Sequence, residues 1–169
     1  TMQEIKKNPA KARELYEPVK NRIKIKDATG RDMNWVESVC KSYKPDIVLL
    51  DMGDKFAKGG FARQDESLKA NAVHARQIAK QYECAVFYMS QLSADAEGKV
   101  LLNQSMMEGS RTGKAAEADL MVLIAKNPPV DNQDEEDTQR HLNVVKNKLT
   151  GWHGVVHCEL EYRTARYTG

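Results

Sequence analysis

Residues 44–54 read KPDIVLLDMGD, and this stretch decides the fold of the chain. Its apolar run, Ile47 to Leu50, is typical of a parallel strand covered on both faces. Asp51 follows the run, so we expect it at the carboxyl edge of a sheet, where ligands of open α/β folds bind. A carboxylate there can hold a magnesium ion, often through water, although an aspartate that only caps the next loop is about as common.

A second strand is predicted at residues 84–89, after a long amphipathic helix. The apolar positions of that helix are Leu68, Ala72, Ala75, Ala79 and Tyr82. The strand ends in Ser90 and Gln91, and the two strand ends of a βαβ unit share one edge of a parallel sheet. A neutral amide at that edge can hydrogen-bond a terminal phosphate or a water, whereas a strand-end glutamine taken alone is more often structural.

Three elements are expected on the N-terminal side of this unit. A helix begins near Pro9, because proline is tolerated in a first turn and apolar residues follow at helical spacing. The alternation in residues 22–26 predicts a short strand. Asp32 is expected to cap a helix that runs to Cys40.

On the C-terminal side, residues 120–124 predict a third buried strand. Two alternating segments, 141–148 and 155–162, are joined by a glycine-bounded turn and predict an antiparallel hairpin. The stretch 127–138 is interpreted as a solvated loop because it is rich in acids. These acids are Asp131, Asp134, Glu135, Glu136 and Asp137.

Composition limits the possible classes of protein. A chain of 169 residues, 41% hydrophobic and 30% charged, suits one domain with one core. A net charge of +2 is small, so nucleic-acid binding would depend on local clusters of lysine and arginine. Cys40, Cys84 and Cys158 lack the spacing of a zinc site or disulfide framework and indicate reduced thiols. With no apolar run of roughly 20 residues and no secretory signal, we expect a cytoplasmic protein without a membrane span.

Four segments together resemble a known family. In chain order they are VLLDMGDKF (48–56), YMSQLSA (88–94), EGSRTGKAAEADLMVLI (108–124) and VVKNKLTGWHGVVHCELEY (144–162). Their order is similar to that of the C-terminal ATPase domain of DnaB-type and phage primase-helicase replicative DNA helicases. The resemblance implies a RecA-like α/β fold: a mainly parallel sheet flanked by helices that ends in an antiparallel β-hairpin. It also implies one domain over residues 1–169, with a helical segment at 1–21 and the sheet core and hairpin at 22–169.

The resemblance assigns roles to four residues. Asp51 resembles the Walker B aspartate, which places magnesium through an intervening water. Gln91 resembles the glutamine that couples the γ-phosphate to the DNA loops. Lys146 and Lys148 fall where the family has a lysine and an arginine finger that reach the nucleotide of the neighbouring subunit. Position 148 departs from the pattern, because lysine lacks the planar fork of arginine. Exposed lysines on a hairpin strand are the simpler alternative.

Two basic loops resemble the family's central DNA-binding loops. They contribute Lys55, Lys58 and Arg63 from 53–63, and Lys99, Arg111 and Lys114 from 98–114. In a ring of identical subunits, a hexamer in this family, such loops line the channel and track the phosphates of single-stranded DNA. Ordinary solvated loop charge is the alternative interpretation.

No phosphate-binding loop of the pattern GxxxxGK[ST] occurs in the chain. Residues 109–114, GSRTGK, imitate one but fail its spacing, since Glu108 stands where the first glycine belongs and Ala115 follows the lysine. We therefore expect ATP, or another nucleoside triphosphate, and Mg²⁺ to be used only with a missing N-terminal part that carries the phosphate loop. That part would come from a longer gene product or from a split gene, and Thr1 suits a splicing junction.

Three functional classes remain open on the sequence alone. The first is an ATP-dependent replicative helicase, of phage or bacterial type, with a primase among its possible partners. The second is a recombinase-like DNA-binding ATPase that assembles on DNA without unwinding it. The third is an interaction module without catalysis. The paired lysines Lys146 and Lys148 and the segment before the third strand favour the helicase.

Overall fold

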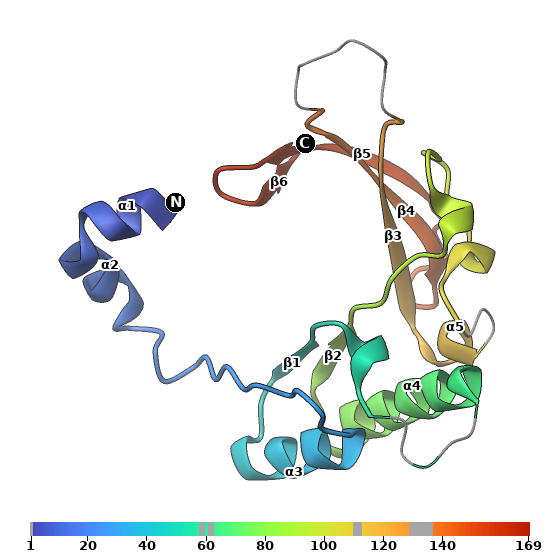
Figure 1. Ribbon diagram of the computed structural model, residues 1–169, viewed down its shortest axis with the longest axis horizontal. Coiled ribbons are helices and arrows are strands. Elements are labelled where there is room, and N and C mark those ends of the chain that lie inside the picture. The colour runs from blue at the N-terminus through green and yellow to red at the C-terminus, as the bar shows by residue number, and fades with distance from the viewer. Residues whose placement is uncertain (1, 58–59, 61–62, 110–112, 129–136) are drawn as a thin grey trace.

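The computed structural model describes residues 2–57, 60, 63–109, 113–128 and 137–169. Its helices and strands follow one another along the chain as shown in Figure 1. The helices are α1 (Met2–Lys7), α2 (Pro9–Tyr16), α3 (Met33–Tyr43), α4 (Gln64–Gln81) and α5 (Gly113–Glu117), with 3-10 turns η1 (Gly53–Lys55), η2 (Ala94–Ala96) and η3 (Gln104–Met106). The strands are β1 (Ile47–Leu50), β2 (Ala85–Tyr88), β3 (Leu120–Lys126), β4 (Gln139–Asn147), β5 (Gly154–Glu161) and β6 (Arg166–Thr168).

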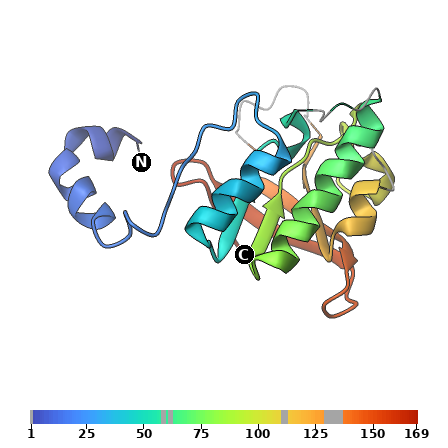
Figure 2. The same ribbon diagram turned by 90° about the horizontal axis from the view of Figure 1, so that it is seen from below.

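The first half of the core is a parallel βαβ unit. Strands β1 and β2 pair in parallel, with Ile47 opposite Ala85 and Leu50 opposite Tyr88. Helices α3 and α4 lie beside each other on one face of this pair (Figure 2). Ile78 of α4, only 1% exposed, lies at the centre of the core that they share with the strands. The predicted strands and the helix between them are confirmed.

Helix α3 begins and ends as its sequence predicts. The side chain of Asp32 accepts a hydrogen bond from the backbone N–H of Trp35 at 3.0 Å, which satisfies one of the free donors of the first turn. Lys44 adopts a left-handed conformation with φ of 46° and ends the helix before Pro45. The apolar side of α3 then packs against α4 and β1.

The second half is a separate antiparallel sheet in the order β3-β4-β5-β6. Alternate residues of β3 are buried, and Met121, Leu123 and Ala125 enter a second core beneath the segment that contains η3. The predicted third strand and the hairpin are both confirmed, as β3 and as the β4–β5 pair. The sequence does not predict β6, because its three residues are too few to show alternation. Parallel pairing in the described residues is thus limited to β1 and β2.

The N-terminal segment confirms one prediction and contradicts another. Helix α2 begins at Pro9, with the side chain of Asn8 as its cap, and α1 precedes it. Residues 22–26 do not form the predicted strand, since they pair with no strand among the described residues, and Ile25 is 90% exposed. Alternation makes a segment suitable for a sheet edge, but a strand also needs a neighbouring strand to accept its hydrogen bonds.

The two parallel strands are covered on one face only. Ile47, Leu49 and Phe87 remain 59%, 63% and 54% exposed. The prediction of cover on both faces is therefore wrong for the described chain, because α3 and α4 lie on the same side of the strands. In the described residues, no helix has the length and apolar character needed to cross a membrane.

Candidate functional site

Asp51 and Gln91 lie at the same edge of the parallel sheet. Asp51 directly follows β1, and Gln91 stands three residues after the end of β2. The backbone N–H of Met89 donates to the carbonyl of Leu50 at 3.1 Å, and that of Gly53 donates to the carbonyl of Met89 at 2.8 Å. The strand ends are therefore tied together beyond the regular sheet. Both polar side chains are exposed at this edge, as the sequence predicts for their position.

A buried ion pair lies beside that edge. The ammonium of Lys114 is 3.0 Å from Oδ2 and 3.1 Å from Oδ1 of Asp54, and 2.7 Å from Oγ of Ser90. The hydroxyl of Ser90 donates in turn to Oδ2 of Asp54 at 2.5 Å. Sequence reasoning missed Asp54, because an acid that follows the strand end by four residues carries no pattern of its own.

Lys114 is placed differently from its prediction. A lysine in a DNA-binding loop should be exposed, but the side chain of Lys114 is only 3% exposed. Lys114 can be buried because the carboxylate of Asp54 replaces the hydration that its ammonium loses. A lysine held in this way has no free face to offer to a phosphate.

Tyr88 and Gly53 pack around this ion pair. The hydroxyl of Tyr88 donates to Oδ1 of Asp54 at 3.4 Å. Burial, together with the nearby charge of Asp54, raises the pKa of Tyr88 well above its ordinary value, so the phenol stays protonated as a donor. A Cβ on Gly53 would come within 2.6 Å of the Tyr88 ring, which explains why glycine occupies this position.

The segment after Gln91 ties the predicted DNA loop to the end of β2. The backbone N–H of Glu108 donates to the carbonyl of Gln91 at 3.2 Å, and Leu92 forms a β-bridge with Met107. The backbone N–H of Ser93 donates to the carbonyl of Met106 at 2.8 Å. Residues 91–93 and 106–108 thus run side by side, joined by backbone hydrogen bonds.

Lys146 near the end of β4 and Lys148 just after it are brought together, and both reach the end of α5. The ammonium of Lys146 donates to the carbonyls of Ala115 and Ala116. Lys148 lies 3.5 Å from both the Ala116 carbonyl and the Asp119 carboxylate. Burial, and then the charge of Lys148, lowers the pKa of Lys146. In the described residues, no hydrogen bond or ion pair joins either lysine to Asp51 or Gln91.

Three of the remaining predicted DNA contacts are exposed and lie in different segments of the chain. Lys55 is exposed on η1, and Lys99 is exposed in the loop after η2. Arg63 stands just before α4 and forms an ion pair with Asp65 at 2.7 Å. Lys58 and Arg111 lie outside the described residues, as do four of the predicted loop acids, Asp131, Asp134, Glu135 and Glu136.

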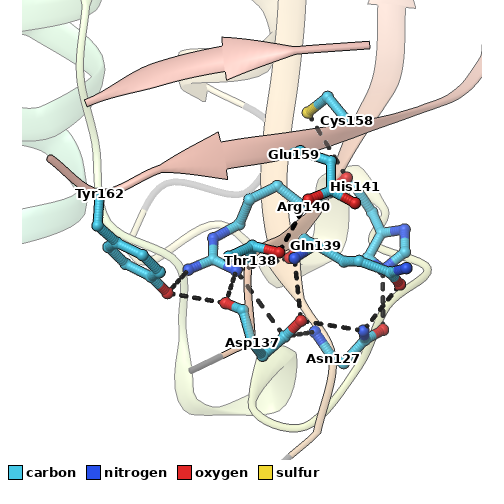
Figure 3. Close-up of polar contacts among 9 residues, drawn as sticks. All are labelled: Asn127, Asp137, Thr138, Gln139, Arg140, His141, Cys158, Glu159 and Tyr162. Atoms are coloured by element: carbon cyan, nitrogen blue, oxygen red, sulfur yellow. Dashed lines mark hydrogen bonds and ion pairs between the residues drawn. The ribbon is translucent and has the colours of Figure 1, made fainter. Parts of the chain in front are cut away.

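A second polar cluster lies between β3, β4 and β5 (Figure 3). Arg140 donates to the carbonyls of Asp137 and Gln139 at 2.8 and 2.6 Å. The ring of His141 contacts Oδ1 of Asn127 at 2.9 Å and Nδ1 of His157 at 2.8 Å. The side chains are satisfied by one another, so the cluster links the end of β3, the start of β4 and β5 where these strands pair. No group of three or more metal-binding side chains occurs in the described part of the chain.

The fold of the described residues is similar to that of two solved structures, an ATPase domain and a replicative helicase. One solved structure, an ATPase domain, matches with a TM-score of 0.72 and 17% identity, over 83% of this chain and 52% of that one. A DnaB-like replicative helicase, described with its interactions with primase, matches with a TM-score of 0.71 and 19% identity, over 86% of this chain and 37% of that one. The chain thus spans about half or less of these structures. No protein-family model and no curated protein matches the sequence.

Proposed function

We propose that this chain is the C-terminal part of the ATPase core of a DnaB-type replicative DNA helicase. The observation that carries the proposal is the parallel register of β1 and β2, which brings Asp51 and Gln91 to one edge of the sheet. Ligands of open α/β folds bind at such an edge. The fold likeness to two helicase ATPase structures supports the same conclusion.

Asp51 fits the role of the magnesium carboxylate. Its side chain is exposed at the strand end, and in the described residues no ion pair occupies it. Asp54, by contrast, is already neutralised by Lys114. Mg²⁺ prefers carboxylate oxygens and keeps several waters, so Asp51 would hold it through water. The bound ion would neutralise charge that develops on the transferred phosphoryl group.

Gln91, Lys146 and Lys148 complete the proposed machinery. The neutral amide of Gln91 can hydrogen-bond the terminal phosphate, and its backbone already holds the segment that leads back from the predicted DNA loop. Lys146 and Lys148 would act on the nucleotide of an adjacent subunit in a ring, after release from their contacts with α5. Five basic residues would contact single-stranded DNA phosphates: Lys55, Arg63 and Lys99, which are exposed, and Lys58 and Arg111, which lie outside the described residues.

The phosphate loop would be supplied by protein outside the present sequence. Two observations support this. The outer edges of β2 and β3 carry no partner strand among the described residues, and the apolar side chains of Ile47, Leu49 and Phe87 are open to further packing. Residues 1–169 would then form one domain together with that part, with 1–21 as a helical segment and 22–169 as core and hairpin.

The test uses the complete protein, with its phosphate-loop part present in cis or added in trans. Asp51→Ala is expected to lower kcat for magnesium-dependent ATP hydrolysis by about 100-fold or more, since a preorganised charge is lost. Asp46→Ala, at the opposite end of the same strand, is the matched control and should leave kcat unchanged. Full turnover by the Asp51→Ala protein would contradict the proposal.

A strand-displacement assay separates the helicase from its alternatives. ATP-driven unwinding of a forked duplex supports the helicase, whereas filament formation on DNA without unwinding would indicate a recombinase-like ATPase. If the added part restores neither, the chain is an interaction module. Purified residues 1–169 alone are expected to show no tight ATP binding and no turnover, because the loop that holds the β- and γ-phosphates is absent from the sequence.

A further inference from the structure

The segment GSRTGK resembles a phosphate loop in sequence, but its lysine serves a different purpose in the fold. Lys114 enters α5, and its ammonium is held by Asp54 of η1 and by Ser90 after β2. The three residues come from three elements that are far apart in the chain. Their side chains therefore fasten α5 to both strand ends at once.

The cluster of Lys114, Asp54 and Ser90 forms a rigid connection between α5 and the strand ends, called the joint below. An ammonium with 3% exposure needs a compensating charge close by, and the carboxylate of Asp54 provides it at 3.0 Å. Asp54 also accepts hydrogen bonds from Ser90 and Tyr88. Because its carboxylate is shared among three donors, a shift of any one element breaks several contacts together.

The position of the joint connects it to the proposed catalytic edge. Asp54 follows Asp51 by three residues, and Ser90 directly precedes Gln91. On its other side, α5 accepts hydrogen bonds from Lys146 of β4 and from Lys148, just after β4, through the carbonyls of Ala115 and Ala116. Lys114 therefore stands between the proposed magnesium edge and the end of β4 where these two lysines lie.

We propose that Lys114 is a positioning residue, which acts through Asp54 and Ser90 to hold Asp51 and Gln91 in their working geometry relative to α5. This inference rests on the proposed function of the same edge. Lys114 does not touch nucleotide or DNA in this role. A displacement of about 1 Å in a catalytic group can cost on the order of 100-fold in rate, so a joint of this kind is expected to control kcat rather than ATP affinity.

The decisive variant is the double substitution Asp54→Asn with Lys114→Met in the complete ATPase. Removing both charges leaves no buried unpaired ion, so the protein is expected to fold. The proposal predicts that kcat falls by about 10- to 100-fold while KM for ATP stays within about 3-fold. Lys80→Met, an exposed lysine in the last turn of α4, is the matched control and should keep both constants.

A measurement without turnover provides the second readout. In residues 1–169, amide hydrogen exchange at Glu108, whose N–H donates to the Gln91 carbonyl, is expected to quicken about 10-fold in the double variant. Exchange at Val86, within β2, should stay unchanged. If the double variant does not fold, Ser90→Ala takes its place, since it removes only the hydroxyl between Lys114 and Asp54.

The outcomes separate this inference from the proposed function. If Asp51→Ala retains full turnover, the proposed function fails. If Asp51→Ala is inactive while the folded double variant keeps the wild-type kcat and the wild-type exchange at Glu108, the positioning role of Lys114 is overturned and its ion pair is only structural. A rise in KM for ATP with kcat unchanged also overturns it, because Lys114 would then act on nucleotide binding.

Discussion

In the α/β half of the molecule, residues 32–91, two parallel strands rest on α3 and α4, whereas in residues 113–168 four antiparallel strands pair in sequence. The antiparallel strands are neighbours in the order in which they follow one another in the chain, and the segment around η3 closes their core. The parallel strands need the whole of α4 as a crossover, and they still expose apolar side chains such as Leu49. An antiparallel sheet can be completed by local chain, but a parallel one depends on strands from elsewhere.

The two halves keep separate cores and meet along α4 and α5. Arg76 of α4 donates to the carbonyl of Glu117 at 2.6 Å and lies 3.5 Å from Asp119. Lys114 adds further polar links, to Asp54 and to Ser90. The difference between the halves therefore lies in how each sheet is covered, while the boundary between them is held by a few charged contacts.

The variant with the largest expected effect on stability tests whether the two halves unfold together. Ile78→Ala removes a buried side chain from the α/β core and is expected to lower the free energy of unfolding by about 2–5 kcal/mol. Ile25→Ala, at an exposed position, is the control and should have almost no effect.

Two tryptophans make this measurement local, since Trp35 lies on α3 and Trp152 in the turn between β4 and β5. Trp35→Phe leaves Trp152 as the fluorescent reporter, and Trp152→Phe leaves Trp35. Equal shifts of both denaturation midpoints are expected, because α4 and α5 are packed together. A shift seen by Trp35 alone would show that the halves are independent.

Arg76→Met should weaken the boundary itself. It removes a charged hydrogen bond to Glu117, which is expected to cost about 1–3 kcal/mol of unfolding free energy. The denaturation midpoints reported by Trp35 and by Trp152 should then differ. Arg13→Met, on exposed α2, controls for the loss of a positive charge. Coincident midpoints in the Arg76 variant would mean that apolar packing alone joins the halves.

Asp32→Ala tests the contribution of one helix cap, at the start of α3, to the stability of the α/β half. Loss of the bond to the Trp35 N–H is expected to reduce stability by about 1 kcal/mol, and only the α/β half contains this helix. Asp32→Asn preserves an acceptor oxygen and should remain close to the wild type. Equal losses in both variants, measured by urea denaturation, would show that charge rather than capping matters at this position.

The smallest effect concerns Glu37 of α3 and His74 of α4, whose side chains are 2.8 Å apart. The hydrogen bond from His74 lowers the pKa of Glu37 below its ordinary 4.5. A lowered folded-state pKa stabilises the fold above 4.5, and this contribution disappears as the pH falls through the lower value. The stability difference between wild type and Glu37→Gln should therefore shrink on acidification. A difference that stays constant with pH would contradict this cause.

Much of the local structure follows from short-range patterns. Helical spacing predicts α4, the apolar runs predict β1 and β2, and Asp32 predicts the start of α3. The common edge of Asp51 and Gln91 follows as well, because a βαβ connection makes the strands parallel. The roles of these two residues remain predictions until the complete protein is assayed.

The sequence by itself thus determined most of the helices and strands and the common edge of the first two strand ends, because each depends on residues a few positions apart. Only the tertiary structure decided that Lys114 is buried against Asp54, that residues 22–26 stay unpaired, and that one face of β1 remains open. These outcomes depend on which distant segments meet and how much water they exclude. Periodicity carries no information about a partner 60 residues away.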